Sequence, residues 1–389
     1  MKRILSISFA LLLIHCAFAQ PGYMPAPENL NSRKEFSEDR FGIFIHWGLY
    51  SMMGQGEWAM QLKNMNYREY AHLADAFYPS KFDARQWVRT FKAAGARYIT
   101  ITSRHHDGFS MFGTSASPYN VVDGTPFGRD VLAEIAQACQ EEGMKLHFYY
   151  SHLDWGRTDF YPRGRTGNGT GRPDEGDWNS YLDFMDTQLT ELLTGYGPIR
   201  AIWFDGIWDK DMYPREDQPE LWNLYHQYEL IHSLQPGCLI GNNHHILPFE
   251  GEDIQIFEKD IPGHNESGFS GQEISPLPLE TCETMNNNWG YCITDTFYKS
   301  EDELVRYLVR TAGKGANLLL NIGPRPDGTL PEEAIERLGA MGSWLSTYGE
   351  SIYGTQAGYI AEQDWGVTTQ KDNVLYLHIL NHQELLSIP

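Results

Sequence analysis

Two carboxylates, Asp205 and Glu258, each stand at the end of a short apolar segment. The segment AIWFDGIW (201–208) is apolar up to Asp205 and turns at the next glycine, and DIQIFE (253–258) ends on Glu258. An aspartate before glycine can simply open a turn, and Glu258, with two charged residues after it, can be an ordinary surface acid. If both face one pocket, they supply the nucleophile or base and the acid that cleavage of a glycosidic bond requires.

Histidine and tryptophan residues accompany these and other apolar segments. His46 and the pair His105–His106 follow two of them, and Trp203 precedes Asp205 by two residues, so both side chains share one face of a strand. Histidines can hydrogen-bond sugar hydroxyls, and tryptophan faces can pack on C–H surfaces. His46 can also be a core histidine. A metal site at His105–His106 is disfavoured because neighbouring strand residues point to opposite faces.

The apolar segments are near-continuous runs, which is typical of strands in a parallel sheet covered on both faces. Seven such runs are present, at 41–48, 97–106, 145–151, 199–206, 237–245, 253–258 and 316–324. Amphipathic helical patterns separate most of them, at 83–95, 129–143, 179–197, 218–234, 300–315 and 331–349. The alternation predicts an α/β fold, a (β/α)8 TIM-like barrel that is irregular between 245 and 253, where no helical pattern is present.

A barrel of this kind places its active site at the C-terminal ends of the strands. Six predicted strand ends carry polar or aromatic residues: His46, Trp47, His105, His106, Asp107, Tyr150, Asp154, Trp155, Trp203, Asp205, Asn242, Asn243, His244, His245 and Glu258. The Gly/Pro-rich segment 157–178 follows the third strand and is typical of a loop that frames such a site. We therefore predict one pocket that contains both Asp205 and Glu258.

The N-terminal residues 1–19 have the pattern of a secretory signal peptide. Lys2 and Arg3 precede an apolar run, and the small residues of Ala17-Phe18-Ala19 predict cleavage after Ala19. The apolar run is too short for a membrane-spanning helix, so no membrane insertion is predicted. We expect a secreted or periplasmic protein.

The catalytic barrel is predicted over residues 20–355, and the pattern changes after it. The segment GVTTQKDNVLYLHILN contains a polar turn at 371–373 and then an alternating strand. Residues 356–389 are therefore predicted to begin a C-terminal β-sandwich, which a segment of this length would leave incomplete.

The composition excludes some functions. A net charge of −21 over 389 residues argues against nucleic-acid binding, which needs basic patches. Apart from Cys16, the cysteines Cys139, Cys238, Cys282 and Cys292 are scattered and favour buried thiols over a disulfide framework, although Cys282 and Cys292 are close enough in sequence to form a bridge. No CxxC pair or HExxH motif is present, so no metal or other cofactor is predicted.

Several segments together resemble the signature blocks of the α-L-fucosidases of glycoside hydrolase family 29. They are RFGIFIHWGLYS, GEW, ITSRHHDGF, YYSHLDW, WFDG, ETMNNNWGY and NLLLNIGPRPDG, in register over roughly residues 38–355. The resemblance implies a retaining exo-glycosidase on a (β/α)8-like barrel with a C-terminal β-sandwich.

The resemblance also implies roles for individual residues. The nucleophile of the family's W-x-D segment falls on Asp205, and aligning GNNHH and the following PG places the acid/base on Glu258, with Glu252, Glu280 and Glu283 as alternatives. Fucose-binding roles fall on His46, Glu57, Trp58, His105, His106, Tyr150, Trp203 and, where some relatives have arginine, His244.

The sequence thus predicts a secreted α-L-fucosidase that acts on fucosylated oligosaccharides or glycoconjugates by double displacement. Glu258 must begin the reaction protonated, so its pKa should be raised by burial or by Asp205. Two alternatives remain open at this point: a metal-dependent TIM-barrel hydrolase that uses Asp205 and the histidines, and a catalytically inactive sugar-binding barrel. Metal analysis with chelator treatment tests the first, and an assay on an aryl fucoside tests the second.

Overall fold

The computed structural model describes residues 22–388 of the chain. The predicted signal peptide (residues 1–19), its cleavage site after Ala19 and Cys16 lie outside the described residues. Within the described part, none of the helices is both long enough and apolar enough to cross a membrane.

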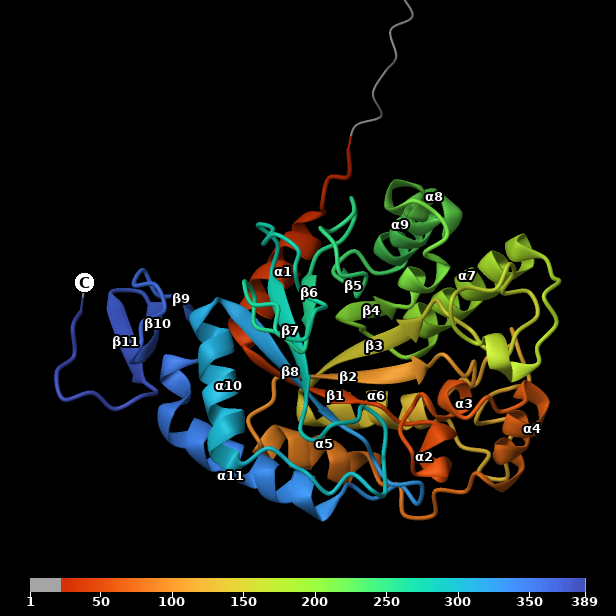
Figure 1. The fold of residues 1–389 in the computed structure, drawn as a ribbon, viewed down its shortest axis with the longest axis horizontal. Helices are drawn as coiled ribbons and strands as arrows, with labels where there is room; N and C mark the ends of the chain where they lie inside the picture. Colours follow the sequence, from red (N-terminus) through yellow and green to blue (C-terminus); the bar gives the residue numbers. More distant parts are fainter. Residues whose placement is uncertain (1–21, 389) are drawn as a thin grey trace, which may run out of the picture.

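Eight parallel strands form a nearly closed barrel (Figure 1). The strands are β1 (Phe41–Ile45), β2 (Tyr98–Arg104), β3 (Lys145–Ser151), β4 (Ala201–Asp205), β5 (Leu239–Asn242), β6 (Gln255–Glu258), β7 (Leu279–Thr284) and β8 (Ala316–Ile322). Their order in the sheet is β5-β4-β3-β2-β1-β8-β7-β6, and an isolated parallel bridge between Gly241 and Ile254 joins the two edges. The predicted barrel class is confirmed, with its irregularity between the fifth and sixth strands.

The helices lie around the strands in the predicted alternation. They are α1 (Pro27–Asp39), α2 (Tyr50–Met53), α3 (Ala59–Leu62), α4 (Tyr67–Ala71), α5 (Ala84–Ala93), α6 (Val131–Glu142), α7 (Trp178–Gly195), α8 (Gln218–Leu221), α9 (Leu224–Leu234), α10 (Glu301–Gly313) and α11 (Glu332–Tyr348). Side-chain caps fix several of their starts: Asp83 accepts from the Gln86 amide at α5, and Ser300 and Glu303 form a capping box at α10.

Helix α1, which the sequence pattern did not predict, closes the N-terminal end of the barrel. Its sequence PENLNSRKEFSED is mostly polar and lacks a clear apolar stripe. Phe36 packs against the ring of Tyr98 at the start of β2, and Asp39 pairs with Lys145 at the start of β3. Helix α1 therefore covers the end of the barrel opposite to the strand ends that carry the predicted site residues.

Strand β7 was also missed, because its sequence LETCET has two polar residues after each apolar one instead of forming an apolar run. The polar residue Glu280 is nevertheless buried within the barrel. Its carboxylate accepts hydrogen bonds from the Tyr98 hydroxyl at 2.5 Å and from the Trp203 indole at 2.9 Å. A buried carboxylate is tolerated where such donors are provided.

Past the barrel, a small antiparallel sheet in the order β11-β10-β9 lies beside α10 (Figure 1). Its strands are β9 (Gln356–Ala357), β10 (Gly366–Lys371) and β11 (Val374–Ile379). The predicted polar turn is confirmed: Lys371 pairs with Val374, and Asp372 between them has a φ of 51°. The division at 355/356 and the assignment of 356–389 to a β-sandwich stay predictions.

Candidate active site

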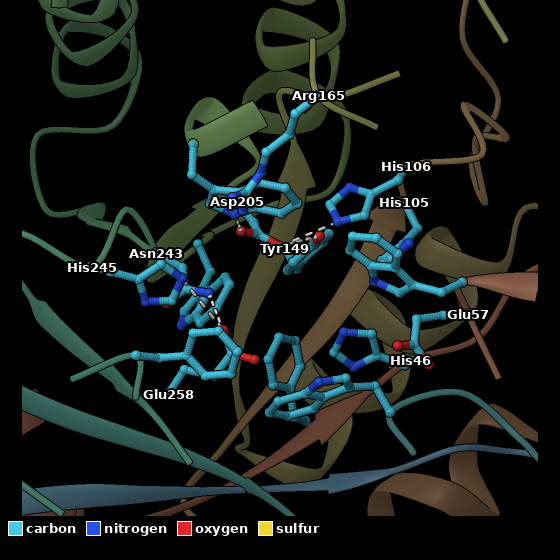
Figure 2. A pocket seen from close by; sticks show the side chains of 16 residues that line it. His46, Glu57, His105, His106, Tyr149, Arg165, Asp205, Asn243, His245 and Glu258 are labelled. Atoms are coloured by element: carbon cyan, nitrogen blue, oxygen red, sulfur yellow. Dashed lines mark hydrogen bonds and ion pairs between the residues drawn. The ribbon is translucent and has the colours of Figure 1, made fainter. Parts of the chain in front are cut away.

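A pocket opens at the C-terminal ends of the barrel strands, with a cavity volume of ≈ 270 Å³. Figure 2 shows side chains from several strands and loops directed into it. The residues that line it are Phe44, His46, Glu57, Trp58, His105, His106, Tyr149, Arg165, Trp203, Asp205, Trp208, Asn243, His245, Glu258, Phe269 and Trp289. Rings and acids together make this a pocket suited to a sugar.

Asp205 is the last residue of β4, and two neighbouring donors orient its carboxylate. The Tyr149 hydroxyl donates to Oδ2 at 2.9 Å, and the Trp208 indole donates to Oδ1 at 2.8 Å. His106 Nε2 lies 3.6 Å from Oδ2. Burial raises the pKa of Asp205 to about 6, while the hydrogen bonds from Trp208 and Tyr149 oppose that rise. The carboxylate is thus available in ionised form near neutral pH, with a fixed orientation.

Glu258 ends β6 and presents the second carboxyl group to the pocket. The amide of Asn243 donates to its Oε2 at 2.8 Å, and His245 Nε2 lies 3.7 Å from the same oxygen. Burial, followed by the negative charge of Asp205, raises the pKa of Glu258 to about 7. The sequence-based expectation of a raised pKa from these two causes is confirmed. A carboxyl group in this range can hold a proton and donate it at neutral pH.

The amide of Asn243 links the environments of the two acids. Its hydrogen bonding lowers the pKa of both Asp205 and Glu258, against the larger effect of burial on each. Since β4 and β5 are neighbours, Asn243, the residue after β5, lies beside Asp205 and reaches Glu258 across the gap in the barrel. The two predicted catalytic carboxyl groups therefore belong to one site.

Three buried histidines form one wall of the pocket. Burial lowers the pKa of His46 to about 3 and holds the pKa values of His105 and His106 well below their usual range. His46 Nδ1 is 2.7 Å from the Asn321 side-chain oxygen, and His106 Nδ1 is 2.7 Å from the Ser151 hydroxyl. Neutral imidazoles fixed in this way can exchange hydrogen bonds with uncharged hydroxyl groups.

Glu57 and Trp58 complete the wall near the histidines. Glu57 accepts a hydrogen bond from the Gly290 amide at 2.7 Å, and burial raises its pKa. Trp58 stacks on Trp208, with ring centroids 6.0 Å apart and planes at 11°. The predicted site residues that the structure brings into the pocket are therefore Asp205, Glu258, His46, Glu57, Trp58, His105, His106 and Trp203.

The prediction that Tyr150 lines the pocket is wrong. Its hydroxyl donates to Gln188 of α7 at 2.9 Å, on the outer face of β3. The preceding residue, Tyr149, faces the pocket and bonds Asp205. Neighbouring residues on a strand point to opposite faces, so a one-residue error in the segment YYS exchanges a pocket residue for a core residue.

The prediction for His244 is also wrong in placement. Its Nε2 is 3.1 Å from both carboxylate oxygens of Glu252, and its ring packs against Phe249 outside the pocket. His245 lines the pocket instead, with a left-handed φ of 62°. After β5 ends at Asn242 the chain no longer alternates, so strand periodicity does not apply here.

The alternative acid/base residues lie outside the pocket. Glu252 also accepts from the Tyr228 hydroxyl at 2.8 Å, Glu280 is bonded beneath Trp203 in the barrel, and Glu283 is 3.3 Å from the Lys299 ammonium. Each of these carboxylates is engaged elsewhere, and of the predicted acid/base candidates Glu258 is the one that lines the pocket with Asp205.

The remaining lining residues had weaker signals in the sequence. Arg165 belongs to segment 157–178, so the prediction that this loop frames the site is confirmed. Trp208 follows the Asp205 turn, and Trp289 stands within the block ETMNNNWGY. Phe269 comes from an irregular segment after β6 without a periodic pattern. No feature of the sequence indicated that Phe269 lines the pocket.

Two further observations concern metal ligands and the cysteines. Over residues 22–388, no group of three or more His, Cys, Asp or Glu side chains is arranged to hold a metal ion. Cys282 and Cys292 are both free thiols, with Cys282 buried, so these two do not form a bridge.

The strand ends of this barrel bring together a candidate carboxylate nucleophile, an acid with a raised pKa and aromatic walls. These are the features of a glycoside hydrolase. A family model described as alpha-L-fucosidase matches residues 10–350. The chain belongs to this family, the α-L-fucosidases of glycoside hydrolase family 29.

Relatives and solved structures agree with this assignment. Over 92% of the chain and 85% of the other protein, the fold resembles alpha-L-fucosidase isoenzyme 1 from Paenibacillus thiaminolyticus, with a TM-score of 0.82 and 36% identity. The human plasma alpha-L-fucosidase is 30% identical over 90% of this chain and 77% of its own length. A family 29 fucosidase from Bacteroides thetaiotaomicron, solved as a trapped covalent intermediate with 2-fluoro-fucosyl fluoride, has a TM-score of 0.78 at 27% identity, covering 94% of this chain and 85% of its own.

Proposed function

We propose that this glycoside hydrolase is a retaining exo-α-L-fucosidase that removes terminal α-L-fucose from oligosaccharides or glycoconjugates. The observation that carries the proposal is the pair Asp205 and Glu258 in one pocket, with hydrogen bonds holding the first and burial beside a negative charge raising the pKa of the second. Two carboxyl groups in different environments are what double displacement requires.

In the first step, ionised Asp205 attacks the anomeric carbon of fucose. The bond from that carbon to the glycosidic oxygen breaks, its electron pair stays on the oxygen, and Glu258 supplies the proton that completes the leaving hydroxyl. Tyr149 and Trp208 aim the carboxylate of Asp205 during this step. The product is a fucosyl ester on Asp205.

In the second step, Glu258 acts as the base. Now ionised, it accepts a proton from water while the water oxygen attacks the anomeric carbon and the bond to Asp205 breaks. Two inversions give fucose with retained configuration. The trapped covalent intermediate of the Bacteroides thetaiotaomicron fucosidase supports the same two-step course for this chain.

The closed inner end of the pocket supports the proposal of exo action. Phe44 and Trp203 pack into the buried interior of the barrel, with Trp289 against them, so the pocket does not continue through the molecule. A pocket closed in this way accepts the end of a glycan chain. Release of fucose alone from a fucosylated oligosaccharide is expected, and detection of internal cleavage of a fucan contradicts exo action.

The test of the mechanism uses Asp205→Ala. We expect loss of turnover on an aryl fucoside, with partial recovery in azide and formation of the inverted fucosyl azide, because azide attacks from the vacated side. The matched control is Asp217→Asn, an exposed aspartate in the segment after β4, which should retain activity. Near wild-type rates for Asp205→Asn would contradict the nucleophile assignment.

We also propose export of the protein, on the basis of Lys2, Arg3, the apolar run and Ala17-Phe18-Ala19. Mass spectrometry of the full chain expressed in a bacterial host should find Gln20 as the first residue of the exported protein. Retention of Met1 in the exported or total protein contradicts cleavage after Ala19.

A further inference from the structure

We propose that Arg165, at the mouth of the pocket, binds an anionic group on the sugar next to fucose, either a carboxylate or a sulfate ester. This inference rests on the proposed fucosidase function and extends it to the class of leaving group. Nothing in the catalytic steps above uses Arg165, although it lines the pocket (Figure 2).

The position of Arg165 places it near the reacting bond, on the open side. It belongs to the loop between β3 and α7, and its guanidinium carbon lies 4.9 Å from the ring centroid of Trp208. The Trp208 indole in turn donates to Asp205, so one aromatic ring separates the guanidinium from the predicted nucleophile. The Arg165 side chain is 54% exposed, which leaves it accessible to a substrate group outside the fucose site.

The guanidinium of Arg165 has donors to spare. Other arginines of the same loop are engaged: Arg157 donates to Asp159 at 2.5 Å, and Arg172 donates to the Phe160 carbonyl at 2.7 Å. Among residues 22–388, the ion-pair partner of Arg165 is Asp211 at 3.8 Å, a distance longer than a hydrogen bond, and that carboxylate is itself 56% exposed. A planar guanidinium matches the paired oxygens of a carboxylate or sulfate.

Two arginine charges act at the pocket wall of a chain that is acidic overall. The chain carries a net charge of −21, yet the positive charges of Arg165 and Arg215 act on His245 at the pocket wall. Burial first, and then His244 and these arginines, lower the pKa of His245 to about 4, so its ring is neutral at working pH. The positive charge of Arg165 can attract an anionic substituent of a substrate that reaches this place.

An aromatic surface stands at the same mouth. Phe269 is 47% exposed, and its ring stacks on His245 with centroids 5.4 Å apart and planes at 30°. An exposed ring of this kind packs against the C–H face of a pyranose. The mouth therefore offers a surface for a sugar ring together with a cation for its charged substituent.

The experiment compares disaccharides in which α-L-fucose is joined to galacturonic acid, to its methyl ester, to galactose 6-sulfate and to galactose, all in one linkage. The ester removes the charge and keeps the ring. With the full wild-type chain we expect kcat/KM for the acid or the sulfate to exceed that of its neutral counterpart by about tenfold, the scale of one charge-assisted hydrogen bond. The charged substrate that is preferred over its neutral counterpart shows whether Arg165 binds a carboxylate or a sulfate.

Arg165→Met and Arg165→Gln should reduce that ratio to about one. The matched control is Arg163→Met in the same loop, whose guanidinium donates to the Arg172 carbonyl at 3.2 Å and does not line the pocket; it should keep the ratio. Equal kcat/KM for charged and neutral substrates in the wild type, or a ratio unchanged in both Arg165 variants, overturns the inference. Failure of the proposed function is distinct, because then neither these substrates nor an aryl fucoside releases fucose.

Discussion

At the residue scale, the two carboxyl groups of the site differ in what surrounds them, and this difference predicts the pH dependence. Asp205 must be ionised, so kcat/KM should rise with pH through its pKa of about 6. Glu258 must be protonated, so kcat/KM should fall above its pKa of about 7. The profile measured from about pH 4 to pH 9 should be a narrow bell.

Glu258→Gln should remove the basic limb of that bell, because no group then loses a catalytic proton. The variant should also lose far more rate on natural oligosaccharides than on aryl fucosides, whose phenolate leaves with little protonation. Glu266→Gln, an exposed residue in the segment after β6, is the control and should keep both properties. Equal losses on both substrate types indicate a binding or structural role for Glu258.

The hydroxyl of Tyr149 allows a second test at this scale. Its hydrogen bond to Asp205 lowers the pKa of that carboxylate, so Tyr149→Phe should move the acid limb to higher pH and cut kcat/KM at pH 6 by about tenfold. Tyr150→Phe is the matched control, because its hydroxyl bonds Gln188 and not Asp205. An acid limb that stays in place in Tyr149→Phe contradicts the assignment of this limb to Asp205.

At the scale of elements, the turn between β4 and the short helix η3 (Ile207–Lys210) fixes both Asp205 and Trp208. Gly206 makes this turn with a φ of 100°, and a Cβ there would lie 2.7 Å from Leu153 Cβ. A side chain at this position is therefore opposed both by the backbone conformation and by a close contact.

Gly206→Ala should lower the free energy of unfolding by about 1–3 kcal/mol and reduce kcat, because either Asp205 or Trp208 must move. Urea unfolding and turnover of an aryl fucoside measure the two effects. The control is Gly195→Ala at the end of α7, where an added Cβ meets nothing within 4 Å; it should be neutral or stabilise by about 0.4–1 kcal/mol. Full activity in Gly206→Ala argues that the turn does not position the site.

At the scale of the whole molecule, buried carboxyl groups make stability depend on pH. Burial raises the folded-state pKa of Asp205 to about 6 and of both Glu258 and Glu280 to about 7. The folded chain therefore binds more protons than the unfolded chain between the usual carboxyl pKa and about pH 7. The contribution of these three carboxyl groups to the free energy of unfolding should fall as pH rises through this window, and it is fully present only below it.

Glu280→Gln should flatten this fall, since an amide does not ionise; the wild-type contribution from this group is on the order of 1–3 kcal/mol. The measurement is the slope of unfolding free energy against pH from about pH 5 to pH 8, which is insensitive to a constant loss of hydrogen bonding. Glu229→Gln, on the exposed face of α9, serves as the control and should leave the slope unchanged. A slope that is the same in Glu280→Gln as in the wild type contradicts the prediction.

The barrel and most of the site residues could be predicted from the order of the amino acids. Parallel strands deliver their ends to one rim, so apolar runs that end in Asp205, Glu258 and the histidines predicted a shared pocket before any distance was known. The family's sequence blocks implied the same two carboxylates and added Glu57 and Trp58. These features depend on short sequence segments and on the parallel direction of the strands. Both can be predicted from the order of residues.

Tertiary structure alone decided the remaining features. Whether Tyr149 or Tyr150 faces the pocket depends on the pleat, and the left-handed His245 enters the pocket because the chain turns after β5. Polar β7 was not recognised because the donors that satisfy Glu280 are distant: Trp203 and Tyr98 lie 77 and 182 residues away in sequence. Contacts between residues so far apart leave no local pattern, because a partner appears only after the barrel has closed.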